Sequence, residues 1–131
     1  MRIIDMHPYD IIAKDAVKHG LDPKVTNASI QTMIAKKIAM LMVSNETVFL
    51  LIHMGEGKFA TRIISQDSPL KFIESLKKFV ARVRKVDGIK ALYGNNEEKG
   101  IIQALKKTGL KVNNANKKGY NWEVNIRKGA L

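Results

Sequence analysis

A long stretch in the second half of the chain has apolar residues at every third or fourth position, a spacing typical of a helix packed on one side. It begins at Ser68-Pro69, because serine is a preferred helix cap and proline is tolerated in the first turn, and it ends at Asp87-Gly88. The apolar positions are Leu70, Phe72, Ile73, Leu76, Phe79, Val80, Val83 and Val86. The pattern predicts a helix of about five turns that packs on a sheet.

Before this helix the pattern changes to one typical of strands. Residues 38–43 and 48–54 are almost continuously apolar, as in strands covered on both faces of a sheet, and Ser44-Asn45-Glu46-Thr47 between them predicts a turn. Gly55-Glu56-Gly57 predicts a second turn, which leads into a third strand over 59–65. These segments predict an antiparallel meander at the centre of the sheet.

The first part of the chain has shorter patterns. Residues 2–4 predict a short strand, and residues 9–19 have the apolar spacing of a helix that ends at Gly20. Residues 25–37 stay open between a helix and an irregular segment. Their apolar spacing is helical, whereas their threonine and asparagine residues argue against a long helix.

After the long helix, the chain predicts a strand, a turn, a helix and another strand. Residues 89–93 form the first strand, and Glu97 and Glu98 open the helix, because its dipole favours negative charge there. Gly109 is placed to end the helix in a left-handed conformation before a strand over 110–112.

The remaining segments complete the predicted fold. Apolar and polar residues alternate over 120–127, which predicts a closing antiparallel strand after a polar loop at 113–119. The strands on either side of the long helix, 59–65 and 89–93, are expected to be parallel through a right-handed crossover. The sequence predicts one α+β domain over residues 1–131, built on a mixed sheet.

Size and composition agree with one folded domain. With 131 residues, of which 45% are hydrophobic, the chain can bury a core without metal or disulfide support. It has no cysteine, and His7, His19 and His53 have no metal-binding spacing, so no metal site is expected. The start of the chain lacks the apolar core of an export signal, and the turn at 44–47 interrupts the longest apolar region. We therefore expect a cytoplasmic protein without a membrane span.

The chain is strongly basic, with 23 Lys and Arg against 12 Asp and Glu and a formal net charge of +11. Such a charge is typical of a protein that contacts nucleic acid or another polyanion, and equally of a basic surface that favours solubility. The candidate polyanion-binding residues lie on the long helix and are Lys71, Lys77, Lys78, Arg82, Arg84 and Lys85.

The order of these elements, together with the asparagine after the 89–93 strand and the Gly109-Leu110 ending of the next helix, resembles the GNAT superfamily of acetyl-CoA-dependent N-acetyltransferases. A narrower resemblance is to the small GNAT-like internal virion protein of short-tailed phages. It rests on short matches at 9–14, 20–23, 94–95, 107–109 and 126–129. This resemblance implies a phage protein in the host cytoplasm or the virion, with virion or host proteins as partners.

The GNAT resemblance also implies a loop with the pattern Q/R-x-x-G-x-G/A before the long helix, whose amides bind the coenzyme pyrophosphate. Residues 65–70 contain no glycine, Pro69 lacks an amide donor, and Asp67 is expected to place a carboxylate where phosphate would bind. The family's tyrosine general acid corresponds to Leu105, which cannot donate a proton. Glu56 and His53 are candidates for the general base, although a lone residue beside a turn is more often a surface residue.

If the chain binds acetyl-CoA, the candidate contacts are Ile64, Ser65, Ser68, Leu70, Asn95 and Asn96. Trp122 alternates with polar neighbours and is expected in the core. Three functions remain open. The first is a catalytically degenerate GNAT-like phage protein that acts in virion assembly or binds a partner. The others are an active acetyl-CoA-dependent N-acetyltransferase and a basic nucleic-acid-binding module.

Overall fold

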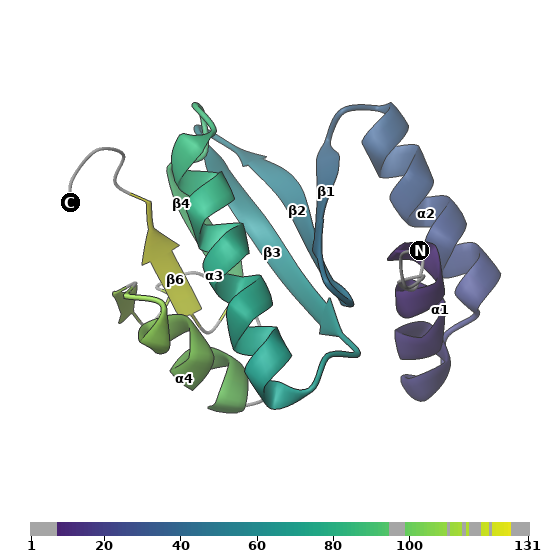
Figure 1. Ribbon diagram of the computed structural model, residues 1–131. Coiled ribbons are helices and arrows are strands. Elements are labelled where there is room, and N and C mark those ends of the chain that lie inside the picture. Colours follow the sequence, from purple (N-terminus) through teal and green to yellow (C-terminus); the bar gives the residue numbers. More distant parts are fainter. Residues whose placement is uncertain are drawn as a thin grey trace, which may run out of the picture.

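The computed structural model describes residues 8–94, 99–109, 111–113, 115, 119–120 and 122–126. In chain order the elements are α1 (Pro8–Lys18), α2 (Pro23–Ala35), β1 (Ala39–Ser44), β2 (Thr47–Gly55), β3 (Lys58–Ser65), α3 (Pro69–Lys85), β4 (Ala91–Gly94), α4 (Lys99–Lys107), β5 (Val112–Asn113) and β6 (Trp122–Asn125). The strands form a mixed sheet in the order β1-β2-β3-β4-β6-β5 (Figure 1). The predicted α+β class is confirmed, as is the predicted order of the elements within the described residues. The strand predicted at 2–4 lies outside them.

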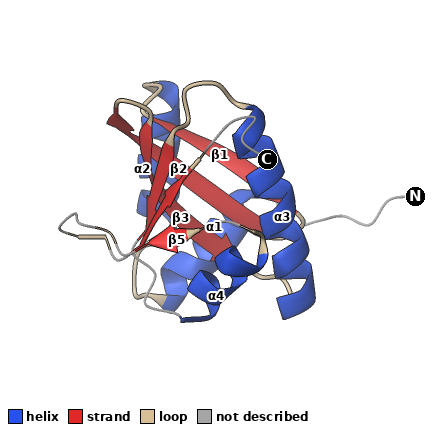
Figure 2. Cartoon of the chain, turned by 90° about the vertical axis from the view of Figure 1, so that its left-hand side faces the viewer, coloured by secondary structure: helices blue, strands red, loops and turns tan. Residues whose placement is uncertain are grey.

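Helices cover both faces of the sheet. The helices α3 and α4 pack on one face, and α1 and α2 pack on the other face of β1 to β3 (Figures 1 and 2). On the α3 side, the rings of Phe49 and Phe79 stack with centroids 4.0 Å apart. The core on the other side includes Ile11, Leu50 and Ile64. No helix in the described part of the chain is long and apolar enough to cross a membrane.

The long helix is confirmed, and its apolar side faces the sheet as predicted. Leu76, Phe79 and Val80 are buried, and Phe72 is half-buried against the same core. The apolar spacing also predicts that Leu70 lies on the buried side, and this prediction is wrong, because the Leu70 side chain is 83% exposed. Residues three or four apart share a helix face, and Leu70 shares its face with the exposed Glu74.

Residues 25–37, which the sequence left open, form most of helix α2. The Asp22 carboxylate caps its first turn by accepting hydrogen bonds from two backbone amides. The Asn27 amide donates to the carbonyl of Tyr9 at 3.2 Å, and the Thr32 hydroxyl donates to a carbonyl one turn earlier at 2.9 Å. Asn27 and Thr32 thus each donate one hydrogen bond that is compatible with the helix, whereas the side-chain oxygen of Asn27 is buried without a partner among the described residues.

The sheet opens between β3 and β4. These strands are parallel, as predicted, but their pairing covers three residues of each, from Lys58 opposite Ala91 to Ala60 opposite Tyr93. Beyond this point β3 continues to Ser65 without a partner in β4. The strands therefore part at the end of the sheet where α3 begins.

Trp122 packs beside this opening, against the last residue of β4. It is 1% exposed and lies opposite Gly94 in the β4–β6 pair. A Cβ atom at position 94 would lie 2.0 Å from two carbons of the indole ring, so only glycine lets the ring approach this closely. The prediction that Trp122 is a core residue is confirmed.

Candidate functional site

The loop before α3 is where the sequence resemblance implies binding of the coenzyme pyrophosphate, and the Asp67 carboxylate in this loop is directed toward the turn between β1 and β2. One oxygen accepts a hydrogen bond from the amide of Glu46 at 3.1 Å. The other accepts from the hydroxyls of Thr47 at 2.6 Å and Ser75 at 3.0 Å. The carboxylate thus ties the turn between β1 and β2 to α3. The prediction that it occupies the phosphate position is wrong, because these donors hold it on the sheet side of the loop.

The first turn of α3 has no side-chain cap. Ser68 is at the N-cap but makes no side-chain hydrogen bond to the helix, and the first turn contains no acidic residue. The amides of Leu70 and Lys71 lie among the first four of a helix, which have no acceptor within it. Pro69 offers no amide. This helix end can hold an anion weakly, with fewer donors than a glycine-rich loop would provide.

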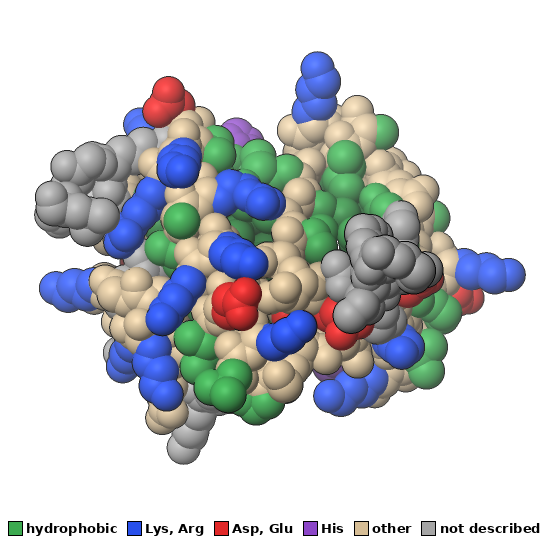
Figure 3. Space-filling view, viewed as in Figure 1, with side chains coloured by type: hydrophobic (Ala, Val, Ile, Leu, Met, Phe, Trp, Pro, Cys, Tyr) green, Lys and Arg blue, Asp and Glu red, His purple; other side chains and the backbone are tan. Residues whose placement is uncertain are grey.

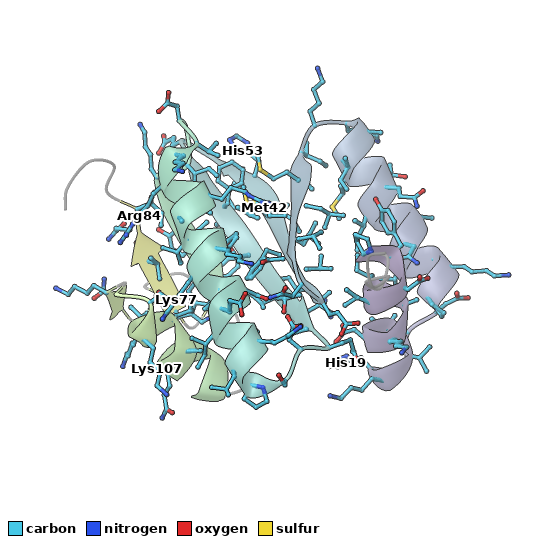
Figure 4. The ribbon with its side chains drawn as sticks, viewed as in Figure 1. His19, Met42, His53, Lys77, Arg84 and Lys107 are labelled. Carbon is cyan, nitrogen blue, oxygen red and sulfur yellow. The ribbon has the colours of Figure 1, made fainter. Side chains whose placement is uncertain are left out.

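The residues predicted for acid–base chemistry do not gather at this helix end. Leu105 is 1% exposed and belongs to the core on the α3 side. His53 and Glu56 lie near the start of β3, whose length of eight residues separates them from the N-terminus of α3 by roughly 20 Å or more. Figure 4 places His53 toward the opposite end of α3.

His53 instead lines a shallow pocket at its own end of the sheet. The pocket has a volume of about 170 Å³ and is lined by residues 37–40, His53 and Phe59. The imidazole packs edge-on against the Phe59 ring, with centroids 5.1 Å apart. No cluster of three metal-ligating side chains occurs in the part of the chain that the structure describes.

The candidate cofactor contacts have different surroundings. The Ile64 side chain is 4% exposed and packs in the α1–α2 core, so it cannot contact a ligand at the α3 end. The Ser65 hydroxyl is held by Thr47 at 2.6 Å and by the amide of Asp67 at 3.1 Å. Ser68 and Leu70 are exposed at the helix end. The other two candidates, Asn95 and Asn96, lie outside the described residues.

The predicted basic residues lie on α3 away from its buried side. Five of the six are exposed and Arg84 is half-buried. Glu74 is the acidic residue of the same helix, and its carboxylate lies 3.2 Å from the Lys78 ammonium. Two exposed lysines of α4, Lys106 and Lys107, were not included in the sequence analysis. Figure 4 shows Lys107 on the same side of the molecule as Lys77, the side on which Figure 3 shows many Lys and Arg side chains. We call this set the basic surface: Lys71, Lys77, Lys78, Arg82, Arg84, Lys85, Lys106 and Lys107.

A polar pair that the sequence analysis missed lies at the end of β4. The Tyr93 hydroxyl donates a hydrogen bond to the Glu123 carboxylate at 3.1 Å. Burial raises the pKa of Tyr93 above its ordinary value of 10.0, and the Glu123 hydrogen bond and charge raise it further. The Tyr120 ring lies 5.8 Å from the Tyr93 ring between centroids. The alternating pattern at 120–127 predicted the strand, but only the register of β4 with β6 brings these groups together.

Comparison with solved structures finds a distant likeness. No protein-family model matches the sequence, and no curated protein matches it. The fold is similar to a protein from Sphaerobacter thermophilus described as a "putative acetyltransferase", with 15% identity and a TM-score of 0.39. The likeness covers 63% of this chain and 58% of the length of that protein. At this level of similarity the match assigns neither a family nor an activity to the chain.

Proposed function

We propose that this chain is a GNAT-like phage protein that has lost catalysis and acts by binding, as a virion component or against a host factor. The observation that carries the proposal is the basic surface, which combines eight basic side chains from two helices with one acidic residue on α3. The phage assignment is supported by the short sequence matches at 9–14, 20–23, 94–95, 107–109 and 126–129. Its place of action would be the host cytoplasm or the virion.

The partner of the basic surface is a polyanion, and DNA is its simplest representative. The side chains on α3 run from Lys71 to Lys85, which spans about 21 Å along the helix axis. Lysine and arginine on an outer helix face bind phosphates through charge and carry little sequence information. The binding is therefore proposed to be salt-dependent and insensitive to DNA sequence.

Charge reversal on α3 tests this proposal. The triple variant Lys77→Glu, Lys78→Glu, Arg82→Glu is expected to lower DNA affinity at low salt at least about tenfold, because three phosphate contacts are lost. The slope of log affinity against log salt should fall by about 2.7, since each contact contributes about 0.9. Fluorescence anisotropy with labelled duplexes of two unrelated sequences measures both quantities.

A matched control separates this surface from net charge alone. Lys18, Lys24 and Lys36 are exposed on the α1–α2 side, and reversing all three changes the net charge by the same amount. This control variant should keep most of its DNA affinity. Equal losses in the two variants would show that the interaction depends on total charge, and no loss in the α3 variant would leave the basic surface as a solvated face.

A second candidate is acetyl transfer, and the direction of the Asp67 side chain favours it. Because Thr47, Ser75 and the Glu46 amide bind this carboxylate, it is engaged by groups other than the amides at the start of α3. The amides of Leu70 and Lys71 thus remain as donors for an anion. Two features argue against this candidate. Residues 65–70 contain no glycine, and Leu105 is buried at the position where the GNAT resemblance implies a tyrosine that acts as the acid.

We expect weak coenzyme binding without turnover. One lost hydrogen bond to a charged group costs about 1.5–3 kcal/mol, so a loop with few donors should bind acetyl-CoA at least about tenfold more weakly than a glycine-rich one. The assay measures free coenzyme A with polyamines, peptides and aminoglycosides as acceptors. Release clearly above a control without protein would overturn the binding proposal in favour of the enzyme.

A further inference from the structure

The shallow pocket beside His53 lies toward the C-terminal end of α3 and is separate from the helix end considered for the coenzyme (Figure 4). Its volume of about 170 Å³ is below the roughly 300–1,000 Å³ of pockets for drug-sized ligands. Three of the residues that line it, Lys37, Ile38 and His53, are exposed, so a ligand can reach it from solvent. Its size suits a molecule with few non-hydrogen atoms.

Apolar side chains surround the imidazole in this pocket. His53 of β2 lies opposite Phe59 of β3, and its backbone amide donates to the carbonyl of Ile38, just before β1, at 2.8 Å. Residues directly opposite each other in antiparallel strands point to the same face, so these three side chains form a row across the sheet. Phe59 belongs to the core under α3, and Met40 packs on the same core. The lining therefore combines one imidazole with several apolar groups.

The two side chains of the lining that can carry charge are both bases. They are Lys37 and His53, and no acidic residue of the described chain lines the pocket. Neither base forms an ion pair or a side-chain hydrogen bond with another described residue. An imidazole has an N–H donor in either protonation state, and an ammonium group has three. Both residues can thus serve an anion in the pocket.

The backbone of Lys37 is unusual for a residue with a side chain. It follows the C-cap of α2 in the left-handed conformation, with φ 62°. The amide of Lys37 donates to the carbonyl of Ile34, and that of Ile38 donates to the carbonyl of Met33, both at 3.0 Å. Glycine is the usual residue at this place in such a helix end, because a side chain strains the left-handed conformation. Lysine at a position that favours glycine points to a role for its ammonium group.

We propose that this pocket binds a small organic carboxylate with an apolar body. The Lys37 ammonium would supply the opposing charge, and the His53 imidazole would donate a hydrogen bond. The side chains of Ile38, Met40 and Phe59 would contact the apolar part. An organic anion fits this lining better than an inorganic one, because four of its six residues are apolar. The site requires neither the basic surface nor acetyl-CoA.

Titration of the full chain with benzoate at constant pH tests the site. The chain has three histidines, whose ring signals in NMR spectra can be assigned with histidine-to-glutamine variants. We expect saturable shifts for His53 and no saturable shift for His19. Sodium chloride at equal ionic strength and the neutral analogue benzamide should not reproduce them. Shifts of His53 that grow linearly with benzoate, or that are equal with benzamide, would overturn the proposal.

The variant Lys37→Gly separates binding from folding, because glycine adopts the left-handed conformation without strain. It should weaken benzoate binding at least about fivefold by removing the opposing charge. Its free energy of unfolding should be unchanged or higher. The matched control is Lys36→Gln, which removes an exposed charge one residue away from a side chain that does not line the pocket. A smaller loss in Lys37→Gly, or an equal loss in both variants, would overturn the proposal.

The variant His53→Leu tests the second polar group. Leucine keeps an apolar side chain beside Phe59 but cannot donate a hydrogen bond, so benzoate affinity should fall at least about threefold. Broadening of the benzoate signals measures affinity here, since the His53 reporter is lost. The control His19→Leu removes an exposed imidazole elsewhere and should leave affinity unchanged. Unchanged affinity in His53→Leu would contradict the proposed site.

Discussion

Replacing Phe79 by alanine is expected to lower the free energy of unfolding by about 3–5 kcal/mol. The Phe79 side chain is 2% exposed, and its ring stacks on Phe49 with the planes 2° from parallel. Truncation removes buried apolar area and leaves a cavity between α3 and β2, which the rigid sheet cannot close fully. Urea unfolding followed by circular dichroism gives the free energy directly.

The control for this variant lies on the same helix. Leu70→Ala also removes a large apolar side chain, but Leu70 is 83% exposed, so its effect should stay within about 0.5 kcal/mol. A loss below about 1 kcal/mol for Phe79→Ala would mean that α3 does not pack on the sheet in this orientation.

Replacing Asp67 by alanine is expected to cost about 2–4 kcal/mol, the second largest effect. Thr47 and Ser75 are each 0% exposed, and both donate to this carboxylate, so the variant removes a charged acceptor from two buried hydroxyls. Neutral acceptors remain for them in the Ser65 hydroxyl and the Ser44 carbonyl. The amide of Glu46 also loses its charged acceptor. Urea unfolding at neutral pH measures this change in the free energy of unfolding. The control is Glu74→Ala, which removes an exposed carboxylate and should change the free energy by close to zero.

The same variant distinguishes the two positions considered for this carboxylate. Because the side chain points away from the start of α3, Asp67→Ala should leave weak phosphate binding at that helix end nearly unchanged. A strong gain in phosphate affinity, measured by calorimetry on the folded variant, would place the carboxylate at the helix end after all. An unchanged free energy of unfolding would contradict the hydrogen-bond network.

Local sequence patterns predicted most of the elements because each depends on residues close together in the chain. The spacing from Phe72 to Val83 specified α3, and Gly109 adopts the left-handed conformation, with φ 87°, that its place after α4 indicated. The polar residues of α2 were misleading because the Asn27 amide nitrogen donates to the backbone of α1. Such a partner is visible only once the two helices pack together.

The candidate site was less predictable for a related reason. The direction of Asp67 is set by Thr47 and Ser75, which are distant in sequence and meet it only in the folded chain. Likewise, the Tyr93–Glu123 pair depends on the register between β4 and β6. The basic residues of α3 could be predicted, because the spacing that identifies a buried side also identifies the opposite one.

The short junction between β3 and β4 also bears on how the chain folds. The strands β1 to β3 pair through tight turns, so this part of the sheet can form early from neighbours in sequence. The strand β4 must instead close a loop that contains all of α3, and only three residue pairs then join it to β3. We therefore expect the half of the sheet that carries Trp122 to dock last during folding and to open first under native conditions.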